Sequence, residues 1–156
     1  MKRDKNLQEL SRDHHHGLLL GWKIRQGIKN NAEPKVMAKY VAYFADEALL
    51  HHFSEEEEQV LNYLPDTDSM KQRTLQEHWV IIQLVNQLKE APSNSYQALL
   101  ELADTLDQHI RFEERELFPY LEQTLNSNEL EAVGAAIAET HQPFTDQFSD
   151  EFWKAN

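Results

Sequence analysis

Two segments of the sequence, 57 positions apart (109 − 52), carry the same pair of metal-binding side chains. His52 is followed four residues later by Glu56, and His109 is followed four residues later by Glu113. Positions i and i+4 share one face of an α-helix, so each segment points an imidazole and a carboxylate in the same direction. If the two helices face each other, two nitrogens and two oxygens meet at one buried point. This repetition indicates a metal site.

The side chains that share a helical face with these residues are apolar, as on the core-facing side of an amphipathic helix. The residues that share their helical faces are Leu102, Leu106 and Leu117 for His109, Ala45, Leu49 and Val60 for His52, and Leu75, Ile81 and Val85 for His78. A buried carboxylate is costly unless it is paired or bound to a metal. For one such pair the alternative is a hydrogen-bonded core histidine with a glutamate partner. Two aligned copies, with further inward histidines, favour the metal site.

The remaining imidazoles are expected from two other helices. His78 lies on an apolar face, and the first helix offers His14, His15 and His16 in a row. When the first helix is aligned with the helix that carries His78 so that Leu18-Leu19 match Ile81-Ile82, His15 becomes the counterpart of His78. His14 is the alternate. His16 is expected to be solvated or to orient a ligand from outside.

The donor count favours two metal ions over one. The candidate ligands are His15 or His14, His52, His78, His109, Glu56 and Glu113. Six protein donors exceed what a four-coordinate zinc ion takes, but they suit two metals bridged by carboxylates. Imidazole and carboxylate donors without sulfur point to iron, with manganese or zinc as the alternatives. In the run Glu55–Glu58 only Glu56 shares the His52 face, and the others are expected in solvent.

Other metal and catalytic motifs are absent from the sequence. The ferritin-like Glu-x-x-His pair would need a glutamate three residues before a histidine, and those positions are apolar. They are Leu49, Leu75, Leu106 and Ala138, before His52, His78, His109 and His141. There is no His-Glu-x-x-His, no Gly-rich phosphate loop and no Gly-x-Ser-x-Gly.

Apolar periodicity predicts five helices and no strand. Their expected ranges are 6–29, 34 to about 63, about 70–90, about 96 to the low 120s, and about 128–153, with polar breaks between them, including one at 91–95. Pro119 is expected to kink or end the fourth helix, and Pro143 to bend the last. Short connections favour an all-α fold: an up-down antiparallel four-helix bundle over about 6–125, with an additional C-terminal helix packed outside. The whole of 1–156 is expected to be one domain.

Composition excludes several classes of function. The formal net charge is −12, which disfavours nucleic acid and anionic membrane surfaces as partners. The chain has no Cys, so it forms no disulfide and no thiolate metal site. No unbroken apolar run follows the N-terminal residues, so neither a signal peptide nor a membrane span is predicted. A soluble cytoplasmic protein is the expectation.

The paired segments resemble the hemerythrin-like, or HHE cation-binding, family. The resemblance rests on His52-Phe53-x-x-Glu56-Glu57 and His109-Ile110-x-x-Glu113-Glu114, with Asp13-His14-His15 and Glu77-His78 on the alternate helices, and covers about residues 7–120. It implies a four-helix bundle around a di-iron centre. By that resemblance His15 (or His14), His52, His78 and His109 are terminal ligands, and Glu56 and Glu113 are the bridges.

The chain departs from the oxygen-carrying members of that family at one position. Their third helix has a second His one turn from the first, whereas Thr74 and Ile82 flank His78 here. The departure resembles the four-His, two-Glu branch, which is linked to sensing, nitric oxide handling or iron release. Glu114 stays an alternative to Glu113, and His141 an alternative ligand.

The expected function is binding or sensing of a small ligand such as dioxygen or nitric oxide at a di-iron centre. One alternative is a di-iron enzyme or iron donor, acting in peroxide or nitric oxide detoxification or in repair of iron centres. The other is a metal-dependent regulatory module, which would need a protein partner that the sequence does not identify.

Overall fold

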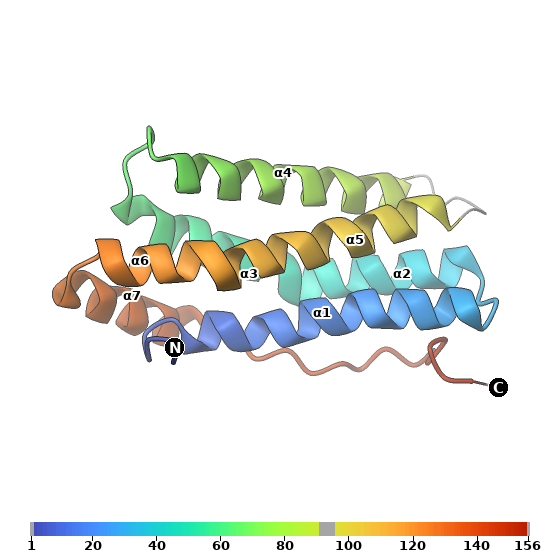
Figure 1. Cartoon of the computed structure of the whole chain (residues 1–156). Coiled ribbons are helices and arrows are strands. Elements are labelled where there is room, and N and C mark those ends of the chain that lie inside the picture. The colour runs from blue at the N-terminus through green and yellow to red at the C-terminus, as the bar shows by residue number, and fades with distance from the viewer. Residues whose placement is uncertain (1, 91–95, 156) are drawn as a thin grey trace.

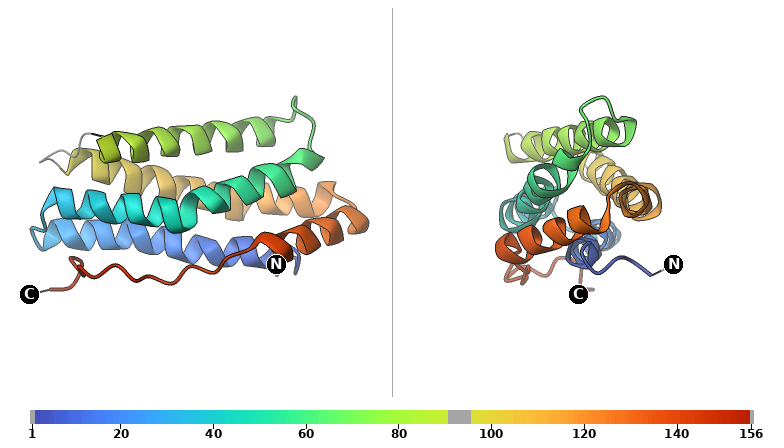
Figure 2. Two further views of the ribbon diagram at one scale, coloured as in Figure 1. Left: turned by 180° about the vertical axis from the view of Figure 1, so that it is seen from behind. Right: turned by 90° about the vertical axis from the view of Figure 1, so that its left-hand side faces the viewer.

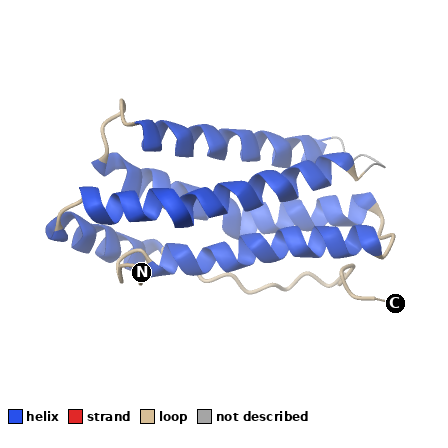
Figure 3. Cartoon of the chain, in the orientation of Figure 1, coloured by secondary structure: helices blue, strands red, loops and turns tan. Residues whose placement is uncertain are grey.

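A computed structural model shows the chain as a bundle of long helices (Figure 1), and it describes residues 2–90 and 96–155. The α-helices are α1 (Gln8–Lys29), α2 (Pro34–Phe44), α3 (Leu50–Glu55), α4 (Ser69–Glu90), α5 (Gln97–Phe112), α6 (Phe118–Thr124) and α7 (Ser127–Thr140). The described residues form no strand (Figure 3), so the predicted all-α class is confirmed. The predicted break at 91–95 lies outside the described residues. Among the described helices, none has the length and apolar character needed to cross a bilayer.

The α-helices join into longer rods through π-helical and 3₁₀ turns. The π turns Ala45–Leu49 and Glu56–Val60 and the 3₁₀ turn Leu61–Tyr63 make one rod with α2 and α3. The π turn Glu113–Leu117 joins α5 to α6. Consecutive rods run in opposite directions along the bundle (Figures 1 and 2). α5 lies between α1 and α4, and α2 packs on α4.

Two buried apolar clusters fill the bundle, with a polar layer between them. Along α1, Leu10 belongs to the cluster at one end of the bundle and Leu20 to the cluster at the other. His14, between them in sequence, is buried without belonging to either. The same order recurs in the second rod, where Phe53 and Val60 belong to different clusters and Glu56 lies between them. The sequence therefore buries its imidazoles and carboxylates in one layer between two hydrophobic blocks.

The two aligned glutamates occupy equivalent backbone positions. Glu56 is the first residue of the π turn Glu56–Val60, and Glu113 is the first residue of the π turn Glu113–Leu117. Such turns inside α-helices are rare and are frequent at functional sites. The repeat seen in the sequence is therefore also a repeat of backbone geometry.

Pro119 does not end the fourth rod, which was one of its two expected effects. The rod continues through α6 to Thr124, with Pro119 in the first turn of that helix. The π turn Glu113–Leu117 ends just before α6, so the proline follows a point where the i→i−4 hydrogen-bond pattern is already interrupted.

The predicted C-terminal helix is wrong beyond residue 140. α7 ends at Thr140, and residues 141–155 form an irregular segment, the C-terminal tail, that runs back along the bundle near α1 (Figure 1). Pro143 lacks an N–H and forces the residue before it out of the helical region, so the helix stops instead of bending. The apolar residues of the tail still face the bundle, as the buried Phe152 shows.

The tail is held by a partly buried polar contact. Asp146 Oδ2 accepts hydrogen bonds from Lys23 Nζ at 2.6 Å and from the Tyr40 hydroxyl at 2.5 Å. Lys23 Nζ also lies 4.0 Å from the centre of the Trp153 ring. These contacts fix the tail against α1 and α2 over most of its length.

Candidate metal centre

Six buried side chains converge in the polar layer, one imidazole from each of four helices and one carboxylate from each of two π turns. They are His14 (α1), His52 (α3), His78 (α4), His109 (α5), Glu56 and Glu113. None is more than 7% exposed. A site of this kind needs all four rods in place, because no rod contributes more than two donors.

The six donors form two overlapping groups of four. The first group is His14, His52, Glu56 and Glu113, and the second is His78, His109, Glu56 and Glu113. Within each group the candidate ligand atoms lie within 4.8 Å of one another. Because both groups contain both glutamates, the arrangement matches two adjacent cations bridged by two carboxylates.

The Nε2 atoms of three imidazoles face the inner carboxylates at 3.1–3.5 Å and form no hydrogen bond with them. The separations from Glu56 Oε1 are 3.3 Å for His52 and 3.2 Å for His78, and from Glu113 Oε2 they are 3.1 Å for His109 and 3.5 Å for His78. Two ligands about 2.1 Å from one tetrahedral ion lie about 3.4 Å apart. The spacing therefore suits ligands of a common ion. His14 differs, because its Nε2 lies 2.8 Å from Glu113 Oε1.

Several inward atoms are buried and make no hydrogen bond. They are Nε2 of His52, His78 and His109, both carboxylate oxygens of Glu56, and Oε2 of Glu113. Leaving a buried polar group unpaired costs about 1–3 kcal/mol, and more if it is charged. So many in one layer fit a site in which cations satisfy them.

A second set of carboxylates surrounds the first and pairs with the outward Nδ1 atoms. The pairs are Asp13 Oδ2 with His52 (2.9 Å), Glu57 Oε2 with His78 (2.8 Å), Glu77 Oε1 with His109 (2.7 Å) and Glu114 Oε2 with His14 (2.7 Å). A carboxylate only accepts hydrogen bonds, so Nδ1 carries the proton in every pair. In the neutral imidazole that tautomer leaves the Nε2 lone pair for a metal, as is usual for metal-bound histidine.

Comparison with known proteins agrees with this geometry. Residues 5–121 match the family model described as the hemerythrin HHE cation binding domain, and a second match covers residues 69–149. The chain belongs to the hemerythrin HHE family. Neither the curated proteins nor the solved structures gave a significant match. The expected family is confirmed, and with it a domain that binds metal cations.

The structure of this hemerythrin HHE domain places His14, the alternate, in the layer in place of the preferred His15. His15 is exposed, whereas His14 is buried in the layer. The reason is the close approach of α1 to α5 at Gly17, where a Cβ would lie 2.6 Å from Cδ1 of Ile110. Because i and i+3 share a helical face, His14 lies on the side of α1 that meets α5. Gly17 was the available signal in the sequence, but its meaning depends on the contact with Ile110 of another helix.

The other open alternatives are placed as follows. Glu113 faces the layer, while Glu114 binds Nδ1 of His14 and accepts from Ser11 Oγ at 2.7 Å. His16 lies outside the layer, with its ring 5.3 Å from that of Phe144. His141 is in neither group of four donors.

The Glu55–Glu58 run is less solvated than the sequence suggested. Glu55 is buried, and Glu57 holds His78. Of the outer partners, Glu114 was considered only as an alternative to Glu113, and Asp13, Glu57 and Glu77 were not singled out as site residues. Each is adjacent in sequence to an inner donor, and that adjacency was the available signal.

The charges in the layer shift the acid–base equilibria of its members. Burial lowers the pKa of His52, but the carboxylates of Glu56 and Asp13 outweigh it and hold that pKa well above its ordinary value. Burial acts likewise on His109, yet Glu113 above all raises its pKa to about 9. Burial raises the pKa of Glu113, and the facing imidazoles hold it well below the ordinary range. Protons and metal ions therefore compete for the same nitrogens.

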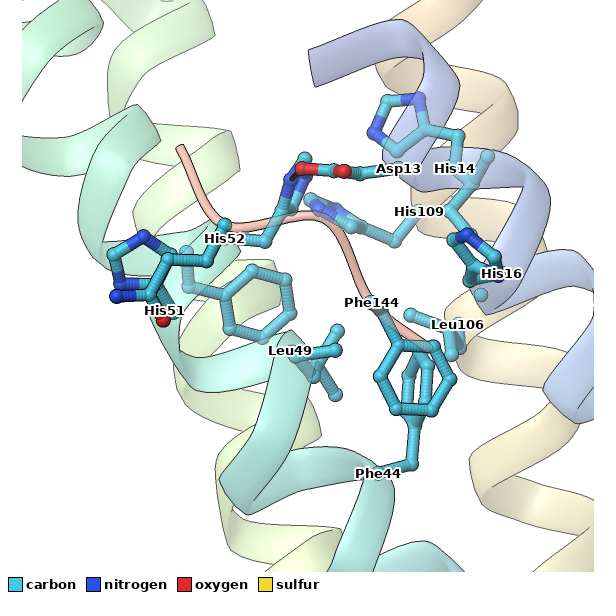
Figure 4. A pocket seen from close by; sticks show the side chains of 15 residues that line it. Asp13, His14, His16, Phe44, Leu49, His51, His52, Leu106, His109 and Phe144 are labelled. Carbon is cyan, nitrogen blue, oxygen red and sulfur yellow. Dashed lines mark hydrogen bonds and ion pairs between the residues drawn. The ribbon is translucent and has the colours of Figure 1, made fainter. Parts of the chain in front are cut away.

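A small cavity of about 30 Å³ opens beside the donors (Figure 4). It is lined by His14, His52 and His109 from the layer, by apolar side chains that include Phe44, Leu49 and Leu106, and by Gln142 and Phe144 from the tail. A volume of this order holds about one water molecule. Any ligand accommodated there without movement of the walls has to be very small.

Proposed function

We propose that this domain holds two metal ions, iron by preference, with manganese or zinc as alternatives, inside an up-down four-helix bundle. His14 and His52 would bind one ion and His78 and His109 the other. Glu56 and Glu113 would bridge the two. Iron is preferred because the donors are imidazole nitrogens and carboxylate oxygens without sulfur.

One observation carries the proposal: two groups of four donors share both carboxylates, and most of the atoms at their centre are buried without a hydrogen bond. A core built only for stability would pair these atoms with one another or replace them by apolar groups. The outer carboxylates support the same conclusion, because they turn the Nε2 atoms of all four imidazoles inward.

We further propose that the domain binds or senses a small ligand, such as dioxygen or nitric oxide. The four protein donors of each group are fewer than an octahedral ion takes. Thr74, one turn before His78, adds no donor, because its hydroxyl is turned to the carbonyl of Met70 at 2.8 Å. Iron bound there would supply an exchangeable coordination position, and the cavity beside His14, His52 and His109 would give a small molecule access to it.

Binding is better supported than turnover. Each imidazole of the layer is paired with an outer carboxylate, and each inner carboxylate belongs to both donor groups. Within this layer no further side chain is placed to move a proton. Hydrogen peroxide or nitric oxide should therefore be consumed no faster by the loaded protein than by free iron.

The deciding experiment is metal analysis of protein produced in iron-supplied cells. Two iron ions per chain are expected, with an absorption spectrum that changes when nitric oxide is added to the reduced protein. Glu56→Ala and His109→Ala should lose metal and melt at a lower temperature, because a bound ion stabilises the folded state by mass action.

Glu58→Ala is the matched control, because Glu58 is an exposed neighbour of Glu56 on the same rod. It should keep both ions. Trace metal in the wild type, or two ions retained in both ligand variants, would remove the proposal. A cytoplasmic location is part of the same proposal, and a chain without Cys is compatible with it.

A further inference from the structure

A second cluster of metal-binding side chains lies outside the four-helix layer, where α1, α3 and the end of α7 meet. It consists of Asp13, Glu55 and His141, each of which offers one ligand atom within 4.8 Å of the others. None of the three belongs to the two donor groups described above. Glu55 is the deepest, with 3% of its side chain exposed, whereas 11% of His141 and 20% of Asp13 are exposed.

The spacing in this cluster suits ligands of one ion better than hydrogen bonds. Asp13 Oδ1 lies 3.5 Å from His141 Nε2, and Glu55 Oε1 lies 3.6 Å from His141 Nδ1. Good N–H···O bonds measure about 2.7–3.2 Å. One ion can bind only one nitrogen of His141, and the spacing of Nδ1 from Glu55 Oε1 is close to the roughly 3.4 Å that separates two ligands of one tetrahedral ion.

The independent observation is an unpaired buried carboxylate oxygen. Glu55 Oε2 accepts a hydrogen bond from Thr140 Oγ1 at 2.8 Å, but Glu55 Oε1 is buried and makes none. His141 Nδ1, which faces it, is also buried without a hydrogen bond. His51 Nε2 lies 3.3 Å from Glu55 Oε1, but it donates its hydrogen bond to the carbonyl of Thr140 at 2.8 Å.

In the part of the chain that the structure describes, no Lys or Arg pairs with Asp13 or Glu55. Asp13 is paired with His52, and Glu9, whose carboxylate lies 3.4 Å from His141 Nε2, is paired with Arg12, so Glu55 is the carboxylate without a cationic partner of its own. An ion-pair network would leave acidic groups in excess around one imidazole. A divalent cation supplies the missing positive charge and the missing partner for Glu55 Oε1.

We propose that Asp13, Glu55 and His141 form a third, mononuclear site for a divalent transition-metal ion. One imidazole with carboxylate oxygens and no sulfur suits ferrous iron, manganese or zinc. The site is coupled to the inner layer, because the other oxygen of Asp13 accepts the Nδ1 proton of His52 at 2.9 Å. An ion at the outer site withdraws charge from the carboxylate that orients an inner ligand, so the two sites influence each other's affinity.

The test is a zinc count on the full-length chain. The metal-free protein is equilibrated with excess Zn²⁺, freed of unbound metal on a desalting column and analysed by mass spectrometry. Glu55→Gln and His141→Asn should each bind one ion fewer than the wild type. Glu55→Gln keeps an oxygen that can accept from Thr140, and the far-ultraviolet circular dichroism of both metal-free variants should match the wild type.

The matched controls change the same residue types at exposed positions. Glu58→Gln on the same rod as Glu55, and His15→Asn on α1, should bind as many ions as the wild type. Glu113→Gln separates this proposal from the inner site: it should lower the inner count, and Glu55→Gln should still remove one ion from that background. An equal count in the wild type, Glu55→Gln and His141→Asn would overturn the third site, whatever the inner layer binds.

Discussion

The carboxylate of Glu77, on α4, lies 2.7 Å from Nδ1 of His109, on α5. Each of the four imidazoles is held in this way by a carboxylate from another rod. The pairs connect α1 to α3 through Asp13, the second rod to α4 through Glu57, α4 to α5 through Glu77, and the fourth rod back to α1 through Glu114. The outer carboxylates therefore form a closed ring around the bundle, and each ties the position of a metal ligand to the packing of two rods.

Glu77→Gln should weaken metal binding without removing it. The amide can accept the Nδ1 proton but carries no negative charge, so His109 becomes a poorer ligand. Loss of an outer partner of this kind typically lowers metal affinity about 10- to 100-fold. Competition with a coloured chelator measures the effect. Glu101→Gln, at an exposed position of α5, is the control and should bind as the wild type does; equal affinity in the two variants would show that the ring does not tune the ligands.

The two neighbours His14 and His15 make a second, internally controlled test. His14→Ala should lower the metal content, because it removes a donor from the first group of four. His15→Ala should leave the content unchanged, since His15 is exposed on the other side of α1. Metal analysis of both variants after identical loading is the measurement. A loss confined to His15→Ala would restore the ligand that the sequence alignment favoured.

The sequence alone was enough to predict which side chains come together where a residue pattern repeats. The spacing of His52 and Glu56, and of His109 and Glu113, predicted one face per helix, and the structure places all four side chains in one buried layer. The long rods were predicted for the same reason, because apolar periodicity over twenty residues averages out local exceptions.

The sequence alone was not enough to predict the orientation of a side chain or the end of a helix where a tertiary contact determines it. His14 and His15 differ by one position, and only the contact of Gly17 with Ile110 shows which of them faces α5. Apolar residues beyond Thr140 have a helical spacing, yet they pack on the bundle from an irregular segment held by Asp146. Periodicity identifies which side chains of a segment are buried, but it does not show whether the backbone of that segment is helical.

The stability of the metal-free protein should fall between pH 6.5 and about 9, and the stabilisation by bound metal should grow over the same range. Facing carboxylates raise the pKa of His109 from 6.5 to about 9 in the folded state. A raised pKa contributes stability that is complete below pH 6.5 and is lost as the pH rises through about 9. The melting temperature of metal-free protein should therefore fall over this range. Metal binding displaces the protons, so the increase in melting temperature on loading should be larger at pH 8.5 than at pH 6.5.

Calorimetry of chelator-treated and reloaded samples across this range measures both trends. His109→Asn should flatten the curve of the metal-free protein, because it removes one of the imidazoles whose pKa is raised. A melting temperature of the metal-free wild type that rises from pH 6.5 to pH 9 would contradict the assignment of the charges in the layer.

The C-terminal tail should limit how fast a small molecule reaches the centre. Phe144 lines the cavity beside His52 and His109, and its ring lies 5.3 Å from that of Phe44. Phe144→Ala widens this wall without touching a metal donor. In iron-loaded protein, nitric oxide should therefore bind and leave about tenfold faster, which corresponds to about 1.4 kcal/mol of barrier. Its equilibrium affinity should change little.

Stopped-flow mixing of the reduced, iron-loaded protein with nitric oxide measures both rates. Phe148→Ala is the control, because Phe148 packs on Tyr40 at 5.0 Å and does not line the cavity. It removes the same aromatic ring from the same tail, so any general loosening of the tail appears in both variants. If both variants bind nitric oxide at the wild-type rate, access does not run past Phe144, and the ligand reaches the layer between the rods instead.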